Sequence, residues 1–220
     1  MKKIAALLLA LTMVVSIASC GDKNNENTTG NVETTTNEVV APKYTSALEV
    51  IETAWNAYPE DQKFFAAGGD YDHMVDNAPG KYNLDVENAS NSLEYMTQFP
   101  ESEFSKIDDA ATLLHGMIAN NFTAGAFHYT NASDVDAGIE AIKESYNNQH
   151  WMCGIPDKLV IFKVPGNYVI SAYGLTDVIE TFKNTVLNNV ENAELVIEQA
   201  TEAGGDDDWW DMGDGGSVLG

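Results

Sequence analysis

The chain of 220 residues contains no arginine, and its 11 cationic side chains are all lysine. They are outnumbered by 34 carboxylates, which gives a formal net charge of -23. Without guanidinium groups the protein lacks the usual bidentate contacts to phosphates and bases, and a polyanion would release few counterions on binding it. The composition therefore excludes a polybasic nucleic-acid-binding protein, and we expect no nucleic acid among its partners.

The sequence also lacks an apolar run of the roughly 20 residues that a membrane-spanning helix needs. A shorter, mostly apolar stretch extends from Ile4 to Ile17, follows two lysines and precedes Ala18-Ser19-Cys20. A cationic start, a short apolar stretch and small residues at its end are typical of an export signal.

Residues 17–20, Ile-Ala-Ser-Cys, resemble a bacterial lipobox. The resemblance implies that residues 1–19 are a lipoprotein signal peptide and that Cys20 is diacylated on its sulfur and becomes the mature N-terminus. Two or three acyl chains, at about 0.8 kcal/mol per buried methylene, anchor a protein durably without a spanning helix. We therefore expect a protein on the extracytoplasmic face of a bacterial membrane, with the bilayer as its partner through Cys20. The alternatives are an ordinary cleaved secretory peptide and a short membrane helix.

Cysteine is scarce, since the chain has two such residues, Cys20 and Cys153. With Cys20 as the lipid site, no intramolecular disulfide can form. A single cysteine after Trp151 and Met152 is typical of a small buried apolar residue. A Cys/His site with His150 is the alternative, although no second pair of residues at metal-ligand spacing accompanies it.

The remainder of the chain divides into three parts by composition. Residues 20–43 begin with the lipidated Cys20 and continue without apolar periodicity, which is typical of a disordered tether. Residues 44–203 carry the periodic patterns of a single domain, with 7 lysines against 25 carboxylates and a net charge of -18. Residues 204–220 form an acidic tail of Gly, Asp and Trp. Eight Phe, nine Tyr and four Trp in the chain supply enough apolar surface for a core.

Apolar spacing and capping residues predict the elements of the domain. Helices are predicted for Ser46–Tyr58, Ser105–Ile118, Ser133–Tyr146 and Asp177–Ile197, the last with a break near 188–189. Strands are predicted for Phe122–Thr130, Lys158–Val164 and Asn167–Tyr173, the last two as a hairpin, and Ser92–Phe99 is a short helix or strand. This order favours an α+β fold, in which helices pack on one face of a mainly antiparallel sheet of three to four strands.

The lipobox, the Asn/Thr-rich tether and several stretches of the domain resemble a family of small uncharacterised lipoproteins of low-GC Gram-positive bacteria. In that family a strand, a charged helix and a break precede a hairpin whose second strand begins Gly-Asn-Tyr-Val. The matching stretches here are Ala124–Tyr129, Asp134–Gln149, Cys153–Pro156 and Gly166–Val169. The resemblance implies a fold and a location, and it brings no activity with it.

Asp70, Asp72, His73 and Asp76 form a cluster between two glycine-containing breaks. Carboxylates and an imidazole can ligate a metal or serve as general acid and base, and His150 is a candidate ligand together with Asp70, Asp72 and His73. The alternative is a solvated loop, because the same residue types form turns. His115 and His128, which stand in periodic segments, are predicted to be packed, hydrogen-bonded histidines.

Trp209 and Trp210 stand among the carboxylates of the acidic tail. Their surroundings suggest a short linear motif that docks into a basic, aromatic-accepting groove of a partner. The alternative is a plain solubilising tail, and the spacing of the aspartates does not match a calcium-binding loop.

No catalytic motif accompanies these candidates: Gly-x-Ser-x-Gly, Ser-x-x-Lys, His-Glu-x-x-His and a glycine-rich phosphate loop are all missing from the sequence. We therefore expect a membrane-anchored lipoprotein that binds a protein or cell-wall component of the envelope without chemistry. We expect the covalent lipid on Cys20 as its one prosthetic group, and a divalent cation is a further candidate cofactor. The alternative is a metal-assisted envelope hydrolase, which requires Asp70, Asp72, His73 and His150 to converge in one cleft.

Overall fold

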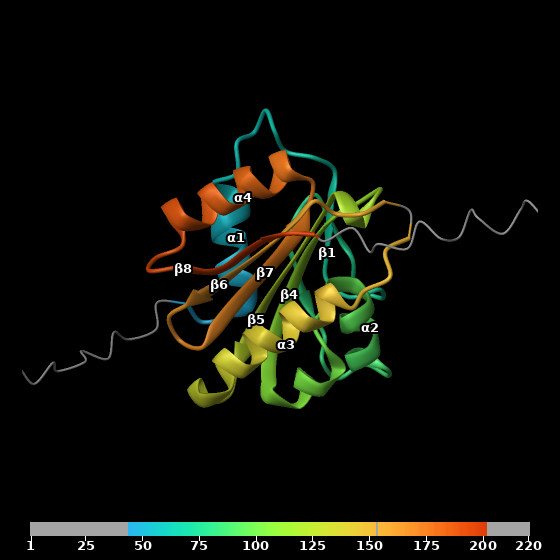
Figure 1. Ribbon diagram of the computed structural model, residues 1–220, viewed down its shortest axis with the longest axis vertical. Coiled ribbons are helices and arrows are strands. Elements are labelled where there is room, and N and C mark those ends of the chain that lie inside the picture. Colours follow the sequence, from blue (N-terminus) through green and yellow to red (C-terminus); the bar gives the residue numbers. More distant parts are fainter. Residues whose placement is uncertain (1–43, 153, 202–220) are drawn as a thin grey trace, which may run out of the picture. The chain divides into compact units, whose positions relative to one another are not determined.

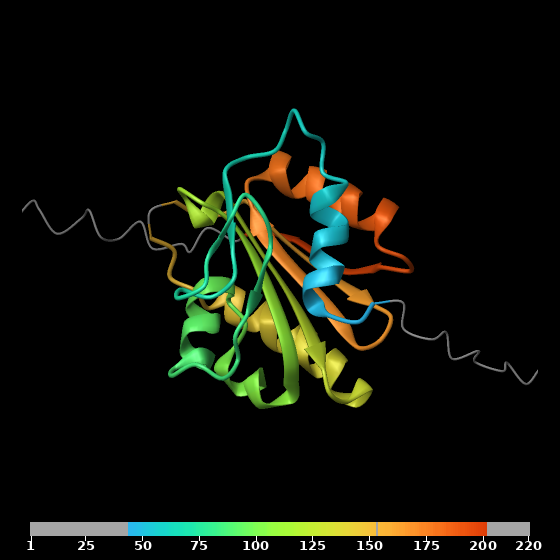
Figure 2. The same cartoon turned by 180° about the vertical axis from the view of Figure 1, so that it is seen from behind.

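The computed structural model describes residues 44–152 and 154–201 (Figures 1 and 2). Its helices are α1 (Ala47–Asn56), α2 (Ala89–Thr97), α3 (Val135–Asn147) and α4 (Thr176–Asn189). Its strands are β1 (Ala66–Gly68), β2 (Val75–Asp76), β3 (Gly80–Tyr82), β4 (Ile107–His115), β5 (Phe122–Tyr129), β6 (Lys158–Val164), β7 (Tyr168–Gly174) and β8 (Glu194–Ala200). Short 3-10 helices cover Glu101–Lys106, Ala119–Asn121 and Ala132–Asp134. The predicted signal peptide and tether, Cys20, Cys153 and the acidic tail with Trp209 and Trp210 lie outside the described residues.

The eight strands form one antiparallel sheet in the order β2-β1-β4-β5-β7-β6-β8, and β3 also pairs with β4. The α+β class and the mainly antiparallel sheet are confirmed, but the prediction of three to four strands is wrong. Strands β1, β2 and β3 have two or three residues each, which is too short to show a period of two in the sequence. None of the helices in the described part of the chain is long and apolar enough to cross a membrane.

Helices cover both faces of the sheet, which corrects the prediction of a single covered face. On one face α1 and α4 bury Ile51 and Phe182 against Phe162 of β6. On the other face α2 and α3 bury Leu93 and Ile142 against the sheet. In Figure 1 α3 lies in front of the sheet. In Figure 2, which shows the molecule from the opposite side, α1 lies in front of the sheet. Two layers are needed because the central strands β5 and β7 are apolar and buried on both sides.

Strand β4 occupies most of the segment Ser105–Ile118, for which the sequence predicts a helix. The apolar residues of this segment recur at helical spacing, but Ala110, Ala111 and Leu113 are all fully buried, on both faces of the strand. A short segment that is apolar on both sides does not distinguish a buried strand from a helix by periodicity. Pairing with β5 on one side, and with β1 and β3 on the other, decides for the strand.

The predicted helix Asp177–Ile197 is likewise correct only in its first part. It ends at Asn189, at the predicted break, and Val190 has extended backbone angles. The remainder becomes β8, an edge strand in which Ile197 pairs with Ile161 of β6.

The other elements agree with the sequence prediction. The Oγ of Ser46 accepts a hydrogen bond from the N–H of Glu49 at 3.1 Å and caps α1. Strand β5, helix α3 and the hairpin of β6 and β7 lie within one or two residues of their predicted bounds, and the segment Ser92–Phe99 is mostly helical.

Candidate functional site

The predicted cluster around Asp70 is a tightly hydrogen-bonded turn. Asp70 is buried, with 2% of the residue exposed, and its Oδ1 accepts the backbone N–H groups of Asp72 and His73, each at 2.9 Å. The Nδ1 of His73 lies 3.0 Å from the same oxygen, and Oδ2 accepts the N–H of Asn83 at 3.2 Å. Burial opposes ionisation, but the hydrogen bonds from His73, Asp72 and Asn83 outweigh it and lower the pKa of Asp70. The carboxylate therefore stabilises the turn and the neighbouring strand through these hydrogen bonds.

His150, the fourth predicted ligand, lines a different part of the surface. Asp70 and His73 line a pocket of about 630 Å³ with Lys81 and Asp109, and His150 is not among its lining residues. Within residues 44–152 and 154–201, no three His, Cys, Asp or Glu side chains are placed to hold one metal ion. Metal binding by these four residues stays a prediction, and the described geometry directs attention to the surface around His150.

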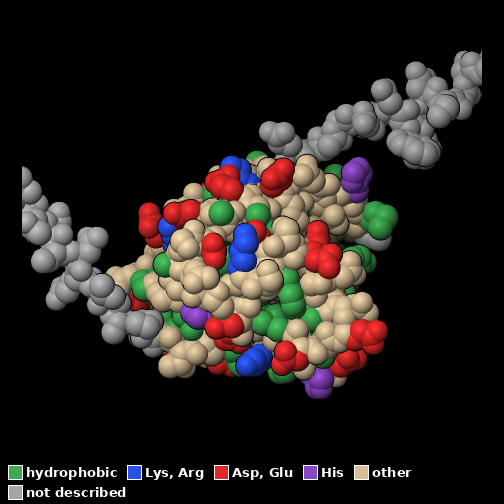
Figure 3. Space-filling view, turned by 90° about the horizontal axis from the view of Figure 1, so that it is seen from below, with side chains coloured by type: hydrophobic (Ala, Val, Ile, Leu, Met, Phe, Trp, Pro, Cys, Tyr) green, Lys and Arg blue, Asp and Glu red, His purple; other side chains and the backbone are tan. Residues whose placement is uncertain are grey.

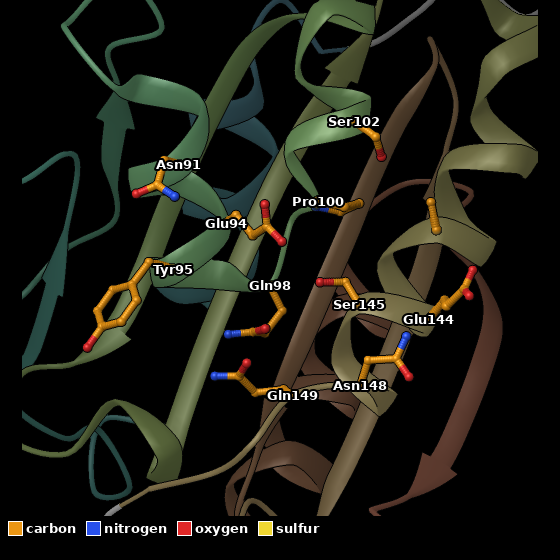
Figure 4. Close-up of a pocket in the computed structure, with 11 residues that line it drawn as sticks. Asn91, Glu94, Tyr95, Gln98, Pro100, Ser102, Glu144, Ser145, Asn148 and Gln149 are labelled. Atoms are coloured by element: carbon orange, nitrogen blue, oxygen red, sulfur yellow. The ribbon is translucent and has the colours of Figure 1, made fainter.

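A groove between α2 and α3 is the first of two hollows on that surface, and we call it the polar groove (Figure 4). Its cavity measures about 500 Å³. Its polar lining comes from both helices and the residues that follow them: Asn91, Glu94, Tyr95, Gln98, Ser102, Glu144, Ser145, Asn148 and Gln149. Figure 4 shows the side chains of Gln98 and Gln149 pointing the same way across the groove.

Helix ends place these amides. Gln98 terminates α2 in the left-handed conformation, with φ of 60°, and its N–H bonds the carbonyl of Glu94 at 2.8 Å. The N–H groups of Asn148 and Gln149 similarly bond back onto the last turn of α3. Both helices therefore stop at the same rim of the groove, which leaves their terminal amide side chains beside the cavity.

The second hollow, which we call the methionine pocket, adjoins the first and has a cavity of about 340 Å³. Tyr95, Gln98 and Gln149 line both hollows, so the two form one continuous surface. Trp151 and Tyr173 line the pocket, and their ring centroids are 5.2 Å apart.

The rim of the methionine pocket exposes large apolar side chains. Met117, Met152 and Tyr95 are 80%, 76% and 73% exposed, and Tyr71 and Met74 are more than half exposed. Large exposed apolar patches mark binding surfaces in soluble proteins. The rim residues lie on separate segments that meet because β1 pairs with the end of β4 and β5 pairs with β7.

Hydrogen bonds hold the two loops that carry Met117 and Met152. The Nδ2 of Asn120 donates to the carbonyl oxygens of Met152 and Gly154, at 2.9 and 2.7 Å. The Nδ1 of His115 accepts the N–H groups of Met117 and Ile118, both at 3.3 Å. The His115 ring stacks on Phe64 at 5.1 Å, so this histidine is packed and hydrogen-bonded as predicted.

The electrostatics of the methionine pocket differ from those of the domain around it. Asp and Glu side chains are spread over the face shown in Figure 3, among few lysines. Yet no Asp, Glu or Lys among the described residues lines the methionine pocket. Burial raises the pKa of Tyr173 far above its ordinary value, outweighing hydrogen bonds with Thr123 and Gln98, so its hydroxyl stays neutral. The pocket is thus an uncharged surface on an acidic domain.

Apart from His150, which was predicted as a metal ligand, sequence reasoning missed the residues of this surface. Tyr95, Gln98, Met117 and Asn120 stand in segments whose patterns indicate helices or a break and give no sign of a shared cavity. The one signal was the run Asn148–Met152, where amides and large side chains follow the end of a predicted helix.

The fold and the site define an α+β domain with a continuous hollowed surface of polar and aromatic side chains over one helical layer. No known family model, curated protein or solved structure matches the chain. The properties of the surface itself are therefore the basis for its function.

Proposed function

We propose that the protein is a lipid-anchored extracytoplasmic binding protein of the bacterial envelope, and that its ligand is a neutral glycan of the cell wall. The observation that carries this proposal is the continuity of the polar groove with the methionine pocket through Tyr95, Gln98 and Gln149.

The side chains of the polar groove suit sugar hydroxyls. A hydroxyl group both donates and accepts hydrogen bonds, and an amide side chain offers two donors and an acceptor in one plane. Gln98, Asn148 and Gln149 supply three such amides, and Ser145 adds a hydroxyl. These groups can satisfy a ring of hydroxyls, and Glu94 and Glu144, which line the same groove, disfavour an anionic ligand.

The aromatic part of the surface suits the apolar face of a sugar ring. Sugar rings expose C–H groups on their faces, and a flat aromatic side chain covers such a face with large contact area at low entropic cost. Tyr95 is exposed at the junction of the two hollows, and Trp151 lies in the adjoining pocket. A ligand that lies across the junction would contact amides at one end and rings at the other.

Charge favours a neutral ligand over an anionic polymer. The domain of residues 44–203 has a net charge of -18, so it repels anionic envelope polymers over a distance of about 8–10 Å at physiological salt. The lipid on Cys20 and the tether of residues 20–43 would keep the domain close to the cell wall. Loss of the protein from the membrane fraction in a Cys20→Ser variant tests that anchor.

Calorimetric titration of neutral cell-wall glycan fragments into the full chain, in detergent, tests the ligand. Replacement Tyr95→Ala removes an exposed ring, and Asn148→Ala removes an exposed amide, so we expect each to weaken binding about tenfold, the equivalent of about 1.4 kcal/mol. The matched control is Asn184→Ala, an exposed amide on α4 at the opposite face, which should bind like the wild type. Equal affinity in all three variants, or no binding by the wild type, would refute the proposal.

A further inference from the structure

The four methionines in the described part of the chain, Met74, Met96, Met117 and Met152, all line the methionine pocket. Met96 is buried, but Met74, Met117 and Met152 are 54%, 80% and 76% exposed. Exposed side chains contribute little to core packing, so the gathering of three thioethers around a cavity of 340 Å³ calls for an explanation other than stability.

His150 brings an imidazole to the same cavity. Its side chain is exposed and makes no hydrogen bond with another described residue. Neither ring nitrogen therefore has a partner among the described residues, and both can bind a ligand. A neutral imidazole is a good metal ligand.

His115 lines the pocket too, but its hydrogen bonds exclude it as a ligand. Its Nδ1 accepts two backbone N–H groups, so the proton of the neutral ring is on Nε2. A metal-bound histidine has the opposite arrangement, because it binds with one nitrogen and donates a hydrogen bond from the other.

Backbone contacts hold the segments that carry His150 and the three exposed methionines near one another. The hydrogen bonds from Asn120 tie the loop of Met152, two residues after His150, to the chain just beyond Met117. Met74 directly precedes β2, which pairs with β1 beside β4, and it lines the same cavity. Methionine has three rotatable side-chain bonds, so the sulfurs can turn toward a common centre without movement of the backbone.

We infer that the methionine pocket is a Cu(I) site, with the thioethers of Met74, Met117 and Met152 and the imidazole of His150 as ligands. Thioethers are soft ligands and select Cu(I), whereas Mg²⁺, Ca²⁺ and Mn²⁺ prefer oxygen ligands such as carboxylates. The lining residues in the described ranges offer no carboxylate to such hard ions. A neutral ligand set suits a monovalent ion, and the acidic domain attracts cations toward it. This inference is independent of glycan binding.

The test uses the full chain with Cys20→Ser and Cys153→Ser, so that neither thiol binds the metal. Methionine methyl groups are labelled with ¹³C, and Ag(I), a redox-inert monovalent ion with the same preference for sulfur, is added stepwise. We expect the methyl resonances of Met74, Met117 and Met152 to shift together and to stop at one equivalent. The resonance of Met96, which is buried, is the internal control and should stay close to its original position.

Variants then separate metal binding from apolar contact. Leucine resembles methionine in size and polarity but has no sulfur, so the triple replacement of Met74, Met117 and Met152 by Leu keeps the apolar rim. We expect this variant to lose about a hundredfold in Cu(I) affinity, measured without oxygen against a chromophoric Cu(I) chelator, and His150→Gln to lose about tenfold. Met96→Leu should bind Cu(I) like the parent.

Wild-type Cu(I) affinity in the triple Leu variant would overturn the inference. Equal shifts of the methyl resonances of Met74, Met96, Met117 and Met152 without a one-to-one endpoint would overturn it too. The two proposals fail separately. The Asn148→Ala variant, whose side chain lines the polar groove and not the methionine pocket, should lose glycan affinity and keep its Cu(I) affinity.

Discussion

The two helical layers of this protein cover the same sheet in different ways. On one face, α1 and α4 pack against each other over a continuous apolar core. On the other face, the polar groove separates α2 from α3, and amides and methionines stand exposed around it. A sheet with two apolar faces can thus be closed on one face for stability while the other face keeps an open groove between its helices.

Ion pairs reinforce the closed side. Lys158 of β6 and Lys183 of α4 both bond Glu198 of β8 at 2.8 Å, and both also bond Glu180. The four side chains connect α4 to the last two strands of the sheet. On the other side, Lys163 of β6 pairs with Asp136 in the first turn of α3, whereas the polar groove is lined by the later turns of that helix.

The largest expected effect concerns the core under α4. Phe182 is fully buried and stacks edge to face with Phe122 at 5.1 Å. Phe182→Ala should lower the free energy of unfolding by about 3–5 kcal/mol, because it leaves a cavity in a close-packed core. Denaturant unfolding measures the loss, and Leu187→Ala, an exposed residue of the same helix, should change it by less than about 0.5 kcal/mol. If both variants lost a similar free energy of unfolding, Phe182 would not be part of a close-packed core, and the contrast between the two layers would fail.

An intermediate effect is expected where α3 contacts the sheet. A Cβ on Gly138 would lie 2.0 Å from the Oη of Tyr129. Gly138→Ala should therefore destabilise the protein by about 1–2 kcal/mol, since overpacking exceeds the gain in helix propensity, and should weaken glycan binding by shifting α3.

Tyr129→Phe provides the control for that change. The Tyr129 hydroxyl is buried without a hydrogen-bond partner in the described part of the chain, so its removal alone should cost little. Combined with Gly138→Ala it removes the nearest clashing atom and should restore part of both stability and binding. If stability falls but glycan affinity stays constant, the position of α3 does not matter for the groove.

The smallest effect is expected from the ion pairs, and it depends on pH. Hydrogen bonds from Lys158 and Lys183 lower the pKa of Glu198 from its ordinary 4.5 to about 2. A carboxyl group with a lowered folded-state pKa stabilises the fold above its unfolded pKa, and this contribution is lost as the pH falls from about 4.5 to 2. Glu198→Gln should therefore cost less than about 1 kcal/mol at pH 7, since the group is partly exposed, and nothing near pH 2. A cost that is equal at both pH values would mean that charge is not its source.

Local patterns predict much of this fold. The capping of α1 by Ser46, the stripe of α3 and the turn between β6 and β7 depend on residues within a few positions of each other. Strand β4 and the end of α4 were mispredicted because Ala111 and Ile197 fit a helical stripe as well as a buried strand. Pairing partners that lie distant in the sequence settle such cases, and the sequence pattern does not contain them.

The sequence by itself determined the acidic character of the chain, its lack of arginine and its locally encoded helices and hairpin, because each depends on composition or on near neighbours. The tertiary structure alone decided that helices cover both faces of the sheet and that Tyr95, Met117 and His150 share one surface. These residues lie on three separate segments, and only strand pairing and helix packing bring them together. A surface of this kind is a property of the assembled fold and has no counterpart in local sequence.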